Sequence, residues 1–112
     1  MSRIVQDREI PEHLSEACKK WCRDVLRDYE LEQHGWFTLI AAAEAWDDKE
    51  AARKILAVTG FTYTDRFNCP KPRPEVAIVR DSRIAFARLV RELGLPVGEP
   101  EAPRSPRVGG KQ

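Results

Sequence analysis

Residues 60–96, GFTYTDRFNCPKPRPEVAIVRDSRIAFARLVRELGLP, carry the clearest structural signals of the chain. Along 74–93 apolar residues recur at intervals of three and four, which is the period of one face of an α-helix. Pro74 suits the first helical position, where its missing N–H is not needed. Gly94 is a typical C-terminal stop, and Pro96 prevents continuation. The pattern predicts a long helix over about 74–93.

The part of this stretch that precedes the helix has the pattern of β-structure. Aromatic residues alternate with threonines along 61–64, which is the period of a strand. Asp65 and Asn68 supply turn chemistry. Pro70 and Pro72 keep a helix from starting earlier, because proline disfavours helical backbone in the residue before it. A short β-hairpin or an extended arm is therefore predicted ahead of the third helix.

Two further helices are predicted upstream. The first extends from about Pro11 to about Gln33, and the second from about Phe37 to Val58. The apolar stripe of the first is Leu14, Cys18, Trp21, Val25 and Tyr29. The second is rich in alanine, so another helix can approach it closely. Gly35 is expected to cap the first helix. The predicted fold is mainly α: an antiparallel helical hairpin, a third long helix and a short β-hairpin or arm between helices two and three.

The three tryptophans give different expectations. Trp21 and Trp46 fall on apolar stripes and are expected in the core. Trp36 follows the predicted helix end and is expected to be partly exposed, with Phe37 beside it. Exposed aromatic residues of this size usually mark a contact with another chain. A simple cap over the helical hairpin is the alternative that the sequence leaves open.

Length and composition indicate one small domain. The chain has 112 residues, of which 42% are hydrophobic and 33% charged. The predicted division is a flexible N-terminus (1–9), a helical domain (10–96) and a disordered basic tail (97–112). So small a core is marginal alone, and burial against further copies would stabilise it. No apolar run approaches the roughly 20 residues that cross a membrane. An odd number of cysteines without a leading signal segment favours a reducing compartment.

Charge is unevenly divided along the chain. Residues 1–60 hold nine Lys and Arg against twelve Asp and Glu, a net charge of −3, whereas residues 61–112 hold ten against six, a net charge of +4. The basic positions singled out as a phosphate-binding surface are Arg66, Lys71, Arg73, Arg80 and Arg83. The sequence leaves a solvated helix face open as the alternative, because opposite charges lie nearby on the same helix.

No catalytic pattern stands out. The chain has neither a Walker-type glycine loop nor a Ser/His/Asp arrangement. Cys18 and Cys22 are one helical turn apart, but their place on the apolar stripe favours core thiols over a metal site. A cluster of Asp47, Asp48 and Glu50 with His34 is the basis of a remote alternative, a metal-dependent enzyme. The prediction is a non-catalytic protein without metal or cofactor.

The order of these parts resembles the small subunits of tailed-phage terminases. The resemblance covers about residues 10–97 and rests on five features. These are a Pro-x-x-Leu start (Pro11, Leu14) to a helix bearing Trp21, an alanine-rich second helix, a strand-like insert that begins with glycine, an Asn-x-Pro-Lys-Pro-x-Pro loop from Asn68 to Pro74, and an Arg-Glu-Leu-Gly-Leu-Pro ending from Arg91 to Pro96. In many members the loop reads Asn-Pro directly, whereas Cys69 intervenes here.

The resemblance implies a non-enzymatic function in DNA packaging. Such subunits assemble into homo-oligomeric rings, bind double-stranded phage DNA and pass it to a large subunit that carries the ATPase and nuclease. It implies the cytoplasm of the infected bacterial host as the location. The expected oligomer contacts are Trp36, Phe37, Ile40 and Ala43. The expected DNA contacts are the five basic residues named above. The alternative is a small helical interaction module or adaptor that does not bind DNA.

Overall fold

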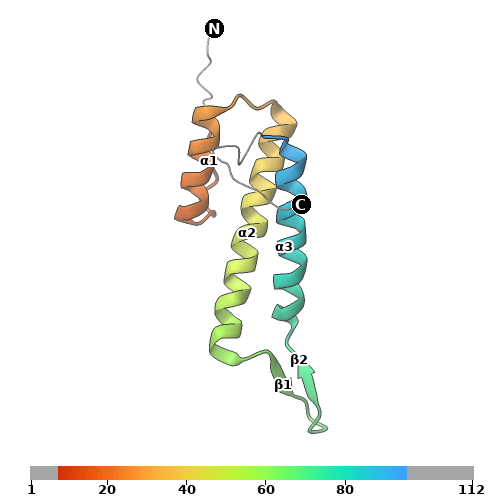
Figure 1. Cartoon of the computed structure of the whole chain (residues 1–112). Coiled ribbons are helices and arrows are strands. Elements are labelled where there is room, and N and C mark those ends of the chain that lie inside the picture. Colours follow the sequence, from red (N-terminus) through yellow and green to blue (C-terminus); the bar gives the residue numbers. More distant parts are fainter. Residues whose placement is uncertain (1–7, 96–112) are drawn as a thin grey trace, which may run out of the picture.

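The computed structural model describes residues 8–95, which form three helices and a two-stranded hairpin (Figure 1). The elements are α1 (Glu16–Asp28), α2 (Gln33–Thr59), β1 (Thr62–Thr64), β2 (Pro70–Pro72) and α3 (Pro74–Leu93). The mainly α fold with a β-hairpin between the second and third helices is confirmed. The predicted tail (97–112) and most of the predicted N-terminal segment (1–9) lie outside the described residues. Assembly into an oligomer stays a prediction.

The main helical pair is α2 with α3, and this corrects the expectation that the first two helices form the long hairpin. At about 1.5 Å per residue, the 27 residues of α2 extend about 40 Å and the 13 residues of α1 only about 20 Å. Figure 1 shows α1 beside the N-terminal half of α2, whereas α3 runs back along α2 and the hairpin projects beyond their far end. The protein is therefore thick at one end and a two-helix arm at the other.

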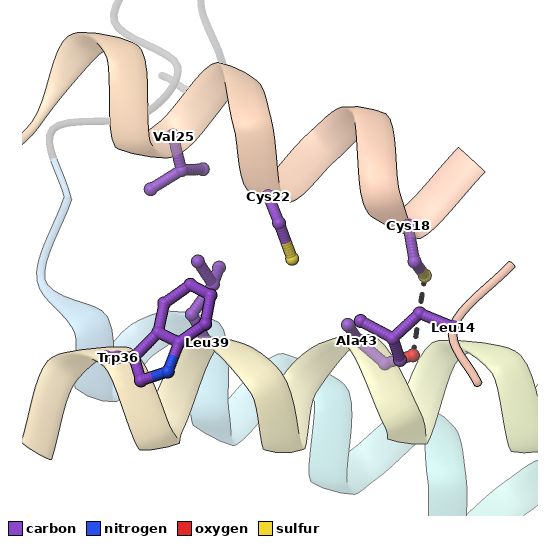
Figure 2. Close-up of a cluster of buried hydrophobic side chains, with 7 residues drawn as sticks. All are labelled: Leu14, Cys18, Cys22, Val25, Trp36, Leu39 and Ala43. Carbon is purple, nitrogen blue, oxygen red and sulfur yellow. Dashed lines mark hydrogen bonds between the residues drawn. The ribbon is translucent and has the colours of Figure 1, made fainter. Parts of the chain in front are cut away.

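The core lies where α1 crosses the first half of α2 (Figure 2). Its buried residues are Leu14, Cys18, Cys22, Val25, Trp36, Leu39 and Ala43. Leu39 and Cys22 are completely buried. The single hydrogen of the Cys18 thiol is shared between two acceptors of α2, the Ala43 carbonyl oxygen at 3.4 Å and Asp47 Oδ1 at 3.3 Å, and this contact joins the two helices across the core. The expectation that Cys18 and Cys22 are core thiols is confirmed.

The tryptophan expectations are reversed for two of the three residues. Trp36 is only 8% exposed, whereas Trp46 is 36% exposed. The reason is the helix start: because α2 begins at Gln33, Trp36 lies one turn inside the helix and faces α1. Trp21 and Trp46 both pack against the Phe86 ring of α3, with centroids 5.8 and 5.2 Å away. Trp21 is half-buried at this contact.

The first helix begins later than Pro11, at Glu16, because Ser15 caps it. The Ser15 hydroxyl accepts a hydrogen bond from the Cys18 N–H at 3.2 Å, in the manner of an N-cap residue. The Ser15 N–H in turn donates to Asp47 Oδ2 of α2 at 2.8 Å. The start of α1 is thereby fixed by a carboxylate from the neighbouring helix. The local sequence around Ser15 gives no sign of this long-range contact.

The helix break predicted at His34 and Gly35 is also wrong, and lies at residues 29–32 instead. Arg8 holds this connection: it donates to the Leu31 carbonyl at 3.0 Å and to Gln33 Oε1 at 2.9 Å. Leu31 packs against the core cluster and covers its end. Packing of the connection thus outweighs the helix-breaking tendency of Gly35, which lies in the first turn of α2.

Replacing Gly35 with alanine should therefore stabilise the protein by about 0.5–1 kcal/mol, because alanine loses less conformational entropy in a helix. A Cβ atom at Gly35 would lie 3.5 Å from Leu31 Cβ, an ordinary van der Waals contact. Gly94 is the matched control, because its φ of +66° disfavours any side chain and Gly94→Ala should destabilise. Urea unfolding of both variants tests this; a loss of stability in Gly35→Ala would contradict it.

The third helix spans the predicted residues and packs on α2 through small side chains. Pro74 is its first residue, and Gly94 adopts the left-handed conformation that ends it. The buried residues of α2 outside the core cluster are Ala42, Ala45, Ala52 and Leu56. Their spacing of three, seven and four places them on one face of α2, opposite the half-buried apolar stripe of α3. None of the α3 residues is fully buried, so the α2–α3 arm has a thin, one-sided core.

The hairpin pairs Thr62 with Pro72, Tyr63 with Lys71, and Thr64 with Pro70 in an antiparallel register. Hydrogen bonds flank this ladder: Arg73 N–H to the Phe61 carbonyl at 2.9 Å, and Asp65 N–H to the Cys69 carbonyl at 3.0 Å. The prolines alternate with these bonded positions, so their nitrogens face the outer edge of the ribbon. The proline cluster, expected only to delay the third helix, is itself the second strand.

Candidate functional site

Basic and acidic residues are concentrated at different ends of the molecule. The segment 51–83, here called the basic arm, comprises the end of α2, the hairpin and the start of α3. It contains seven Lys and Arg against three Asp and Glu, a net charge of +4. The rest of the described chain, 8–50 and 84–95, contains eight against twelve, a net charge of −4. The charge imbalance between the two halves of the sequence thus becomes a separation of charge between the two ends of the described fold.

A groove of about 660 Å³ runs along the basic arm between α2 and α3. Three arginines line it: Arg53 from α2, and Arg80 and Arg83 from α3. Its apolar lining is Leu56, Ala57, Phe61, Val76, Val79 and Ile84. The sequence predicted Arg80 and Arg83 but missed Arg53, because Arg53 belongs to the acidic half of the sequence. Antiparallel pairing of α2 with α3 brings it beside the other two.

These arginines are only weakly engaged within the protein. Arg80 contacts Asp81 at 3.1 Å in an exposed pair, and Arg53 contacts the half-buried Glu50 at 3.6 Å, in both cases between near neighbours in sequence. Arg83 has no ion pair within residues 8–95. Exposed ion pairs of this kind contribute little free energy, so the guanidinium groups are available to another anion.

The other predicted basic residues lie on the hairpin. The Arg66 guanidinium lies 5.0 Å from the centre of the Phe67 ring, and that of Arg73 lies 5.9 Å from the Tyr63 ring. Lys71 is paired opposite Tyr63 in the ribbon. The Arg73 Nε atom is buried and has no hydrogen-bond partner among the described residues. All five predicted basic residues therefore belong to the basic arm, two in the groove and three on the hairpin.

The residues predicted to contact further copies of the chain differ in their exposure: two are buried and two are at least partly exposed. Trp36 and Ala43 are buried against α1, so their side chains are not on the surface. Ile40 is half-buried, and Phe37 is 60% exposed. The larger exposed apolar surface lies elsewhere, on the basic arm. Its members on the arm include Ile55, Val58, Phe61 and Ile78, and the exposed Ile84 follows directly after the arm in α3.

Asp47, Asp48, Glu50 and His34 do not come together as a site. His34 lies in the first turn of α2 and Asp47 is 13 residues further, about 20 Å along the axis. No group of three or more His, Cys, Asp or Glu with metal-binding geometry occurs among residues 8–95. Asp47 instead accepts hydrogen bonds from the Ser15 N–H at 2.8 Å and the Cys18 thiol at 3.3 Å.

The buried thiols have the pKa values of core groups. Burial, reinforced by the nearby Cys18, raises the pKa of Cys22 to about 11, and burial likewise raises the pKa of Cys18. Thiolates, the reactive form of cysteine, are therefore scarce at both positions. Cys69, at the end of the hairpin turn, is exposed.

None of the helices within 8–95 has the length and apolar character needed to cross a membrane. Comparisons with protein-family models, curated protein sequences and solved structures give no match to this chain.

Proposed function

We propose that this protein is the DNA-binding, ring-forming small subunit of a phage terminase, which recognises viral DNA and regulates the large subunit of the packaging motor. The observation that carries the proposal is the gathering of Arg53, Arg66, Lys71, Arg73, Arg80 and Arg83 on one arm with a net charge of +4. A polyanion such as DNA is the ligand that matches this surface.

The arm has the features of backbone recognition. Arg80 and Arg83 lie one turn apart on α3, and Arg53 lies across the groove from them. Guanidinium groups bind phosphate oxygens with paired N–H donors, and such contacts position a protein on DNA without reading its sequence. Affinity from this source falls steeply with salt because bound counterions are released from the DNA.

Exposed apolar surface supports the ring part of the proposal. Ile55 and Ile78 lie exposed on the basic arm and Ile84 lies exposed just beyond it, and α3 has no fully buried residue. Contiguous apolar surface on a small protein commonly marks a contact with another chain. Neighbouring copies would cover it, together with the exposed Phe37 and the half-buried Ile40. The proposed partners are thus phage DNA, the terminase large subunit and further copies of this chain, in the cytoplasm of the infected bacterium.

Replacing Arg80 and Arg83 with alanine is expected to weaken binding to duplex DNA by roughly tenfold, because two phosphate contacts are lost. The slope of log K against log salt should become shallower by about 0.9 per lost contact. Fluorescence anisotropy with a labelled duplex, measured at several salt concentrations, gives both values.

The matched control removes the same charge from the opposite end of the same helix. Arg88 and Arg91 lie on α3 outside the basic arm, and both are exposed. Arg88→Ala with Arg91→Ala should leave the affinity and the salt slope close to those of the unaltered protein. Equal losses in the two double variants would mean that net charge, not the arm, determines binding.

The mass of the protein in solution distinguishes the ring-forming subunit from the adaptor alternative. Light scattering coupled to size exclusion should show a species of many subunits if the chain forms a ring. A monomer that has no salt-dependent affinity for duplex would instead favour an adaptor that uses its exposed apolar surface for a protein partner.

A further inference from the structure

The tip of the hairpin carries an exposed aromatic side chain in a rigid turn. Phe67 is 71% exposed at the end of the ribbon. The Asp65 carboxylate accepts hydrogen bonds from the N–H groups of Phe67 and Cys69, at 2.8 and 2.9 Å. The Asn68 N–H donates to the Asp65 carbonyl, and Asn68 has a φ of +63°. This is a β-turn followed by a left-handed residue, a standard three-residue hairpin loop.

The only carboxylate of the turn is therefore bound to the turn's own backbone, and the charged group beside the aromatic ring is a cation, Arg66. Arg66 lies beside Phe67, with 5.0 Å between its guanidinium and the ring centre. Further back, the alternation of the ribbon puts Phe61, Tyr63, Lys71 and Arg73 on one face, and threonines and prolines on the other. Aromatic rings interleaved with cations, with no free acidic group, match a ligand that combines phosphates with stacked bases.

The hairpin is also unsuited to pairing with another strand along β2. Pro70 and Pro72 lack the N–H groups that a further strand would need on that edge. A further strand therefore cannot form a regular ladder along β2. The hairpin projects beyond the end of the α2–α3 pair (Figure 1), so its tip can reach a ligand ahead of the helices.

We propose that the hairpin tip enters the minor groove of duplex DNA, where Phe67 wedges against a base step and bends the duplex while Arg66 binds the adjoining phosphates. Apolar wedges flanked by basic residues act in this way in architectural DNA-binding proteins. The inference rests on the proposed DNA binding and adds a specific contact and a distortion of the ligand. Arg80 and Arg83 supply affinity, whereas Phe67 supplies the bend.

The first test measures bending by energy transfer between fluorophores on the two ends of a duplex of about 25 base pairs. Saturation with the unaltered protein should raise the transfer efficiency. Phe67→Ala should bind within about threefold of the unaltered affinity yet lose most of that rise. Phe67→Leu should retain it, because leucine is also an effective wedge. Phe67 is exposed, so neither change should disturb folding, and circular dichroism verifies this.

The second test uses Cys69, whose sulfur lies 3.7 Å from the Phe67 carbonyl oxygen. The exposed thiol is alkylated with an iron–EDTA reagent, and mass spectrometry verifies a single label while Cys18 and Cys22 stay buried. Hydroxyl radicals from the label should cut the duplex around one position, with the offset toward the 3′ side on each strand that is characteristic of minor-groove attack.

The outcomes separate this inference from the proposed function. Binding to duplex that depends on Arg80 and Arg83, without bending or without cleavage from Cys69, overturns the wedge and leaves the DNA-binding proposal standing. No binding to duplex overturns both. Binding to vesicles of anionic lipid that requires Phe67, from a protein that does not bend DNA, would reassign the tip to a lipid surface.

Discussion

Leu39→Ala is expected to destabilise the protein by about 3 kcal/mol, the largest effect of any single change considered for this chain. Leu39 is 0% exposed and lies in the core cluster between α1 and α2. Truncation of such a side chain removes its apolar burial and leaves a cavity, at a cost of about 2–5 kcal/mol. A small domain has only about 5–15 kcal/mol of stability in total, so much of it would be lost.

Urea unfolding followed by circular dichroism at 222 nm measures the change in unfolding free energy caused by Leu39→Ala. Val58→Ala is the control on the same helix. Val58 is exposed, so its truncation should alter stability by no more than about 0.5 kcal/mol. If Leu39→Ala had an equally small effect, the α1–α2 contact could not be the main core. Measurement at low protein concentration keeps any association between copies from contributing to the result.

Asp47→Ala is expected to cost about 2 kcal/mol, because this carboxylate fixes the start of α1 and accepts two hydrogen bonds. Partial burial opposes the charged form of Asp47, but hydrogen bonds from Ser15 and Cys18 outweigh it and lower its pKa below 3.8. A lowered pKa means that the folded state binds the proton less tightly than the unfolded state. The stabilisation is therefore full above about pH 4 and is lost as the pH falls through the folded pKa.

A pH series of urea unfolding curves for Asp47→Asn and for the unaltered protein tests the direction of this pH dependence. The difference in unfolding free energy should be constant near neutral pH and should shrink below about pH 4. Asp48→Asn is the matched control: Asp48 is exposed on the same helix and should show no such difference. A gap between Asp47→Asn and the unaltered protein that widened in acid would contradict the assignment.

The parts of the fold that local chemistry determines could be predicted from the sequence. The third helix follows from Pro74, Gly94 and an apolar stripe, and its limits agree with the prediction. The hairpin follows from alternation and turn residues, although the sequence could not show that the proline cluster is its second strand. Proline is usually excluded from strands, and only the register reveals that Pro70 and Pro72 occupy positions where no N–H is needed.

Errors arose where packing between elements outweighs local signals. The break between α1 and α2 depends on contacts of Arg8 and Leu31 with distant residues, so Gly35 was mistaken for its cause. This shift of the helix start placed Trp36 inside α2 and against α1, where it is buried. The candidate site shows the same limit, since Arg53 joins Arg80 and Arg83 only through antiparallel pairing of two helices.

The two oppositely charged ends would also govern how the molecule approaches the proposed DNA ligand. With net charges of −4 and +4 at opposite ends, the protein has a large electric dipole along its length. Near an extended polyanion it experiences a torque that turns the hairpin forward before contact, whereas the acidic end is repelled. The protein therefore meets the polyanion with its hairpin first more often than random collision would allow. Added salt should slow association far more than it speeds dissociation.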